Sequence, residues 1–168
     1  SVSLSVLAVA DLISVPSYSQ SVARIGLANN SSCNSVEEKL NHYAYKEVSR
    51  RLLVPVGNGQ LLHKDAAIAF FAMKQAAKEE GIYLQPISGF RSIKEQNYLF
   101  YEVAKQRGQT WEKRAKVSAP PGYSQHHTGF AIDINSFNQS FANTKTYAWL
   151  LNNAAKYGFQ LSFHKNNS

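Results

Sequence analysis

Apolar residues recur at helical spacing in the segment that follows residue 63. A helix is predicted over residues 64–80, with Asp65 as its N-cap and Gly81 at its end. Its apolar face consists of Ala66, Phe70, Met73 and Ala77. Because this stripe is continuous over the helix, we expect it to pack on a core.

Three more helices are predicted from the same pattern, over residues 92–108, 111–117 and 144–157. Ser92 and Glu95 have the spacing of a capping box at the start of the first of these helices. Gln96 falls on the apolar face of that helix, so a polar side chain is expected on its buried side.

Alternating apolar residues predict strands at 82–87, 129–135 and 159–163. In the middle strand, Ile132 and Ile134 face one way and Asp133 faces the other. Helices and strands that do not alternate strictly are typical of an α+β fold. We therefore predict a small antiparallel sheet flanked by helices.

A change of composition near Val36 divides the chain. Residues 1–36 are rich in Ser, Asn, Val and Ala and carry few charges, so they are predicted to be a linker or a processed N-terminal segment. Residues 37–168 are predicted to form the folded domain. No apolar run is long enough to cross a bilayer, which takes about 20 residues.

The composition narrows the possible chemistry. The net charge is +7, which favours anionic partners in general, such as an anionic cell wall. No stripe of alternating basic and aromatic residues is present, so nucleic-acid binding is not predicted. Cys33 is the only cysteine, which excludes an internal disulfide and a cysteine-based zinc site.

A loop followed by a strand brings a histidine and a carboxylate into one segment. His126 comes from a loop that contains Pro120 and Pro121, and Asp133 follows on the strand. Ala131 keeps that face of the strand free of bulk, so an ion could approach the carboxylate. One nitrogen and one oxygen ligand suit zinc, although the two side chains could also simply hydrogen-bond to each other.

The longer motifs around these residues resemble a known family. Ser-x-His-x-x-Gly-x-Ala-x-Asp, from Ser124 to Asp133, resembles the zinc signature of lysostaphin-type peptidases, D-Ala-D-Ala metallopeptidases and the hedgehog domain. SGFRS followed by Gln96, PPGYSQHHTGFAIDI, LVPVG and WLLNNAAKYGF is closer still to the VanY-like D-alanyl-D-alanine carboxypeptidases. The resemblance covers about residues 38–168 and implies a hedgehog/D-Ala-D-Ala-peptidase-like fold with a Zn²⁺ cofactor.

The resemblance also implies individual roles. His126 and Asp133 correspond to zinc ligands, and Arg91 to the catalytic group that polarises the scissile carbonyl and stabilises the oxyanion. Ser124 and Gln96 correspond to substrate-binding residues. The structural alternatives are a surface salt bridge for Arg91 and a core amide for Gln96.

One part of the family pattern has no counterpart. The family's catalytic Glu and third ligand, a His, follow the strand after YGF, and no such segment is found before Ser168. We expect the natural protein to continue beyond Ser168, the alternative being an inactive protein. The strand at 159–163 is then expected to lose its hairpin partner.

The function implied by the resemblance is zinc-dependent removal of D-alanine from peptidoglycan stem peptides or precursors ending in D-Ala-D-Ala. An endopeptidase of the same fold and a non-catalytic zinc-containing binding module are the alternatives. The expected location is extracytoplasmic, with membrane contact only through an N-terminal anchor that has been removed. The sequence does not indicate an oligomeric state.

Overall fold

The computed structural model describes residues 4–8, 38–136 and 139–163. The strands are β1 (Leu4–Ala8), β2 (Glu38–Lys39), β3 (His42–Tyr43), β4 (Leu53–Gly57), β5 (Gln60–His63), β6 (Pro86–Ser88), β7 (Ala131–Ile134) and β8 (Phe159–Phe163). The α-helices are α1 (Lys64–Glu79), α2 (Ile93–Asn97), α3 (Val103–Gln106), α4 (Trp111–Ala115) and α5 (Lys145–Asn153). No helix in these ranges is long and apolar enough to span a membrane.

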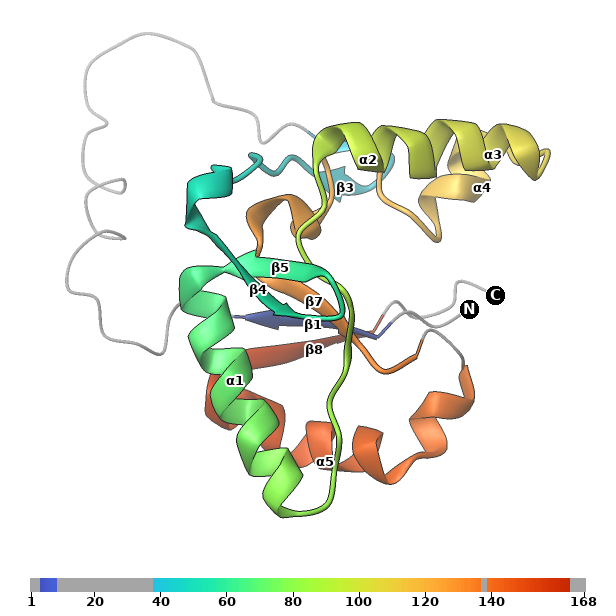
Figure 1. The fold of residues 1–168 in the computed structure, drawn as a ribbon. Helices are drawn as coiled ribbons and strands as arrows, with labels where there is room; N and C mark the ends of the chain where they lie inside the picture. Colours follow the sequence, from blue (N-terminus) through green and yellow to red (C-terminus); the bar gives the residue numbers. More distant parts are fainter. Residues whose placement is uncertain (1–3, 9–37, 137–138, 164–168) are drawn as a thin grey trace, which may run out of the picture.

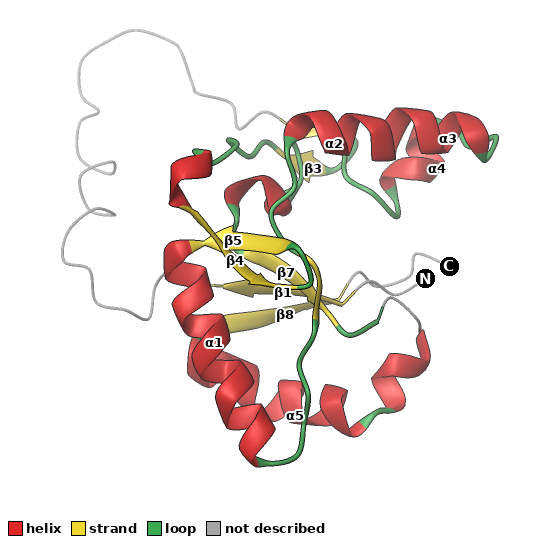
Figure 2. Ribbon diagram, viewed as in Figure 1, coloured by secondary structure: helices red, strands yellow, loops and turns green. Residues whose placement is uncertain are grey.

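The central sheet is antiparallel and has the strand order β6-β7-β1-β8. Two short ribbons, β2–β3 and β4–β5, accompany it, and the helices surround these sheets (Figure 2). Helices α1 and α5 lie on one side of the central sheet, whereas α2, α3 and α4 form a group at its far end (Figure 1). The predicted α+β class with a small antiparallel sheet is confirmed.

Strand β1 corrects the prediction of a linker for its five residues. It lies between β7 and β8, with Ser5 opposite Asp133 on one side and opposite Ser162 on the other. The strand predicted at 159–163 is paired along its whole length with β1 on one side, and among the described strands it lies at the edge of the sheet. The expected loss of its hairpin partner stays a prediction. The rest of the predicted linker, apart from these five residues, lies outside the described residues.

The main core lies between the sheet and helices α1 and α5. Ile132 and Ile134 on β7 are fully buried there, together with Phe70 of α1 and Leu150 of α5. Successive side chains on a strand point to opposite faces, so Asp133 is turned away from this core. Asp133 is nevertheless only 3% exposed, which makes β7 a strand buried on both faces.

Two helix starts test the capping predictions. The N-cap of α1 is His63, whose Nδ1 accepts a hydrogen bond from the Asp65 backbone N–H, so the prediction of Asp65 as N-cap is wrong. The capping box of Ser92 and Glu95 at α2 is confirmed. The helix predicted over 92–108 consists of α2, a π-helical turn at Tyr98–Glu102 and α3.

Candidate metal centre

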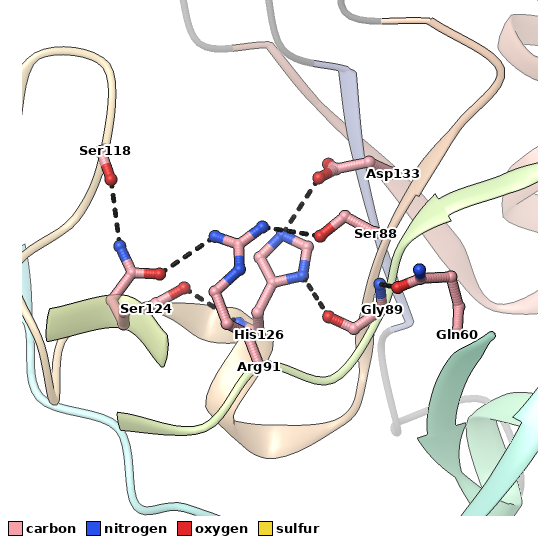
Figure 3. A network of polar contacts seen from close by, with 9 residues as sticks. Gln60, Ser88, Gly89, Arg91, Ser118, Ser124, His126 and Asp133 are labelled. Carbon is pink, nitrogen blue, oxygen red and sulfur yellow. Dashed lines mark hydrogen bonds and ion pairs between the residues drawn. The ribbon is translucent and has the colours of Figure 1, made fainter. Parts of the chain in front are cut away.

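The two predicted metal ligands lie next to each other. His126 belongs to the 3₁₀ helix η4 (Gln125–Thr128), and Asp133 to β7. His126 Nε2 and Asp133 Oδ2 are 3.5 Å apart, and Figure 3 shows the two side chains pointing toward one another. Both residues are buried, His126 being 8% exposed.

A glycine lets the chain turn between these two elements. Gly129 caps η4 with a φ of 74°, in the left-handed region that other residues rarely adopt. A Cβ at this position would also lie 2.9 Å from the backbone nitrogen of His63. The His63 N–H donates to the Gly129 carbonyl at 2.9 Å, so the loop that carries His126 is fixed against β5.

A backbone hydrogen bond determines which His126 nitrogen faces Asp133. His126 Nδ1 lies 2.7 Å from the carbonyl oxygen of Gly89, which can only accept, so Nδ1 carries the hydrogen. The Nε2 lone pair of the neutral ring is then directed toward Asp133. Burial lowers the pKa of His126, with Asp133 acting in the opposite direction, so the imidazole is neutral near pH 7.

This arrangement fits part of a zinc shell. Metal-bound histidines usually donate their second ring N–H to a carbonyl or carboxylate, as His126 does to Gly89. Zinc accepts imidazole nitrogen and carboxylate oxygen, so His126 and Asp133 could supply two donors. Within the described ranges no group of three His, Cys, Asp or Glu could hold a metal ion.

Gly89 is needed because the chain passes very close to a neighbouring strand. A Cβ on Gly89 would collide with the backbone carbonyl oxygen of Leu61 on β5. The Gly89 N–H donates to Gln60 Oε1 at 3.0 Å, while the Gly89 carbonyl accepts a hydrogen bond from His126 Nδ1. One residue of the SGFRS turn therefore connects β5 to the candidate ligand.

Arg91 lies beside the His–Asp pair and is fixed by three hydrogen bonds. Its guanidinium donates to Gln96 Oε1 at 3.0 Å and to Ser88 Oγ at 2.6 Å, and its backbone N–H donates to the His126 carbonyl at 3.1 Å. Burial lowers the pKa of Arg91, while Asp133 and Glu95 raise it. An arginine has so high an ordinary pKa that the group remains a cation.

Gln96 is a buried amide that connects Arg91 to a loop. It is 1% exposed, and its Nε2 donates to Ser118 Oγ at 3.0 Å and to the Ala119 carbonyl at 2.6 Å. With its oxygen on Arg91, both ends of the amide are used inside the protein. The structure thus shows Gln96 orienting Arg91, and a direct contact with substrate remains a prediction.

Ser124 is the N-cap of η4. Its Oγ accepts a hydrogen bond from the His126 backbone N–H at 3.3 Å, and the side chain is buried. The hydroxyl lies at the start of the turn that carries the candidate ligand. Its predicted role in substrate binding likewise remains a prediction.

Two polar residues of this region were not predicted as part of the site. Ser88 has no signal in the sequence beyond its place in the SGFRS motif, yet its Oγ accepts a hydrogen bond from the Arg91 guanidinium. His127 is 0% exposed; its Nδ1 donates to the Arg91 carbonyl at 2.7 Å, and its Nε2 accepts the Gly122 N–H at 3.1 Å.

Comparisons with known proteins identify the family to which the chain belongs. Solved structures with the same fold include the LdcB LD-carboxypeptidase and the D,D-pentapeptidase VanY. A family model described as "VanY: D-alanyl-D-alanine carboxypeptidase" matches residues 59–168. The chain belongs to this VanY family.

Individual relatives agree with this assignment. The putative carboxypeptidase YodJ of Bacillus subtilis (strain 168) is 39% identical over 112 residues, covering 62% of this chain and 40% of that protein. The LdcB LD-carboxypeptidase is 34% identical with a TM-score of 0.58, covering 67% of this chain and 57% of that one. The vancomycin-resistance D,D-pentapeptidase VanY, solved in complex with Zn(II), is 26% identical with a TM-score of 0.52, covering 63% and 64%. The chain thus spans less than half the length of the curated relative.

Proposed function

We propose that the protein is a zinc-dependent carboxypeptidase that removes the terminal D-alanine from peptidoglycan peptides or precursors ending in D-Ala-D-Ala, outside the cytoplasm. The observation that carries the proposal is the buried His126–Asp133 pair, 3.5 Å apart, beside a guanidinium held in a single orientation. Membership of the VanY family and the zinc complex of a related VanY support it.

The residues of this chain have distinct tasks in the proposed reaction. His126 Nε2 and Asp133 would hold the zinc ion, which when bound supplies Lewis acidity for hydrolysis of the peptide bond. Arg91 would donate hydrogen bonds to the oxygen of the scissile carbonyl, where negative charge develops. Because Gln96 and Ser88 already fix the guanidinium, this donor needs little reorganisation when the charge forms.

The general base and the third ligand are not assigned to any described residue. The proposed activity is that of the zinc-loaded natural protein. The sequence motifs of the family place a Glu and a His after the strand that corresponds to β8.

The test is release of D-alanine from a pentapeptide ending in D-Ala-D-Ala by the full-length protein. Wild type with zinc should release D-alanine, and a chelator should stop it. A tetrapeptide ending in L-Lys-D-Ala, offered in parallel, would separate D,D from L,D specificity, since LdcB is an LD-carboxypeptidase.

Arg91 variants test the oxyanion role within the same assay. Arg91→Ala should lower kcat by about 10²–10³ with a small change in KM, because an oxyanion partner acts mainly in the transition state. Arg91→Lys should recover little, since a lysine lacks the planar fork that contacts Gln96 and Ser88. If the folded, zinc-loaded wild type releases no D-alanine from the pentapeptide ending in D-Ala-D-Ala, the proposed function is wrong.

A further inference from the structure

A pocket of about 700 Å³ opens directly beside Ser88 and Arg91. Its walls come from the SGFRS turn, from α2 and from Arg50 in the 3₁₀ helix η2 (Arg50–Leu52). Pockets of about 300–1,000 Å³ are the size that holds drug-sized ligands. The pocket is therefore large enough for substrate residues upstream of the bond that is hydrolysed.

The charged side chains around this pocket are mostly cationic. Arg50, Arg91 and Lys94 line it, and Glu95 is the single acidic residue among its lining side chains. Glu95 is already engaged, because its Oε2 accepts from the Ser92 N–H at 2.8 Å and from Ser92 Oγ at 2.7 Å. These hydrogen bonds hold the pKa of Glu95 below its usual range, so it stays ionised at neutral pH.

Several other polar groups nearby are also occupied. Arg91 donates to Gln96 and Ser88, and the Gln60 amide accepts from Gly89 and donates to the Asn58 carbonyl. The carboxylate of Glu47 accepts the Ile93 N–H at 2.6 Å and does not line the pocket. Arg50 and Lys94 are the two lining cations whose side chains make no hydrogen bond among the described residues, and the ionised Glu95 interacts electrostatically with Arg50, so three lining cations face one lining carboxylate.

Arg50 and Lys94 are available for this purpose. In the described part of the chain no carboxylate lies within ion-pair distance of either of them. The Arg50 guanidinium lies 5.7 Å from the centre of the Phe90 ring, a cation–π contact that holds it at the pocket wall. Ile87, Phe90 and Leu99 give the same pocket an apolar wall.

We propose that Arg50 and Lys94 form a subsite for a carboxylate on a peptide substrate, carried by a residue upstream of the bond that is hydrolysed. The subsite rests on the proposed function, since it selects among peptides for that same site. An amide at the same peptide position would be bound less well, because it brings no charge to the two cations. A stem peptide with a free acidic residue is thus preferred over its amidated form.

The experiment compares pairs of peptides that end in D-Ala-D-Ala and differ only in one group. An acidic residue stands at the first, second or third position upstream of D-Ala-D-Ala in one peptide, and its amide in the twin. Binding is measured by fluorescence anisotropy of labelled peptides, and kcat/KM by D-alanine release, with the full-length zinc-loaded protein. Each exposed ion pair is worth about two- to five-fold, so wild type should favour the best acidic peptide by about ten-fold at low salt.

The variant Arg50→Gln/Lys94→Gln should reduce this preference to about two-fold or less, and high salt should do the same in wild type. The matched control is Arg51→Gln/Lys78→Gln, which removes the same charge from exposed residues that do not line the pocket and should keep the preference. Equal binding of acid and amide by wild type, or an unchanged preference in the Arg50/Lys94 variant, would overturn the subsite.

The two proposals fail in different ways. Hydrolysis of all peptides without acid preference rejects the subsite and leaves the peptidase. Acid-selective binding that depends on Arg50 and Lys94, without release of D-alanine, supports the subsite as a peptide-binding feature and rejects the activity.

Discussion

Replacing His127 should destabilise the protein and disturb the position of Arg91. The ring is fully buried and makes two hydrogen bonds, from Nδ1 to the Arg91 carbonyl and from the Gly122 N–H to Nε2. His127→Phe keeps a flat ring but leaves both backbone groups without this partner. Each lost partner costs about 1–3 kcal/mol, so we expect the free energy of unfolding to fall by about 2–6 kcal/mol.

Two further variants separate the two hydrogen bonds. The side-chain nitrogen of His127→Asn can take the place of Nδ1 and still donate to the Arg91 carbonyl. The side-chain oxygen of His127→Gln can take the place of Nε2 and still accept from Gly122. Each should recover about half of the lost stability, and only His127→Asn should preserve kcat, since only it keeps the hydrogen bond to the Arg91 carbonyl.

Thermal unfolding and D-alanine release measure these effects. At about 2–4 °C per kcal/mol for a chain of this size, the melting temperature of His127→Phe should fall by about 4–24 °C. An unchanged melting temperature for His127→Phe would refute the structural role of the ring. Equal kcat in the Asn and Gln variants, with kcat of both at the wild-type level, would refute its effect on Arg91.

Three other substitutions test the fold. Val6→Pro, in the middle of β1, should lower the free energy of unfolding by about 3 kcal/mol, because proline has no N–H to donate in a central strand. Lys64→Pro, at the first position of α1, is the control and should be tolerated; thermal unfolding of the two variants measures the difference. Gly89→Ala should cost about 1–3 kcal/mol, because its Cβ meets the backbone of β5, and wild-type stability in urea would contradict the packing. The pKa of Glu95 is lowered in the folded state, so its contribution to the free energy of unfolding is present above about pH 4.3 and is lost as the pH falls. Glu95→Gln should therefore reduce the loss of stability between neutral and acidic pH. Identical pH dependence of stability in wild type and variant would exclude this contribution.

The local elements could be predicted from the sequence because their signals are local. The apolar stripe of α1 and the capping box of α2 each lie within a few turns of chain. Strand β1 has no such signal. Its partners are β7 and β8, more than 100 residues away, and only that pairing distinguishes LSVLA from an apolar linker.

The candidate site divides in the same way. His126 and Asp133 belong to one short motif, and a turn at Gly129 brings them together, so the sequence could indicate the pair. The function of His127 depends on the backbones of Arg91 and Gly122, which only the tertiary fold brings to its ring. Gln96 could be predicted to be buried, but the partner of its amide could not.

The N-cap of α1 shows why a favoured residue type is not decisive. Asp65 is a strong capping residue, yet the helix starts one position before it because β5 runs directly into α1. His63 is fixed at the junction by its N–H bond to Gly129 and by stacking on Phe130, with ring centres 4.6 Å apart. Tertiary contacts therefore set the start of the helix.

The most direct test of the account is the zinc content of the full-length protein. After dialysis against metal-free buffer, wild type should retain about one zinc per chain by elemental analysis, and His126→Ala should lose most of it while remaining folded by circular dichroism. His42→Ala, which removes a histidine bonded to the Ala115 carbonyl, is the matched control and should keep its zinc. Equal zinc in wild type and His126→Ala would contradict the assignment of His126 and Asp133 as the metal-binding pair.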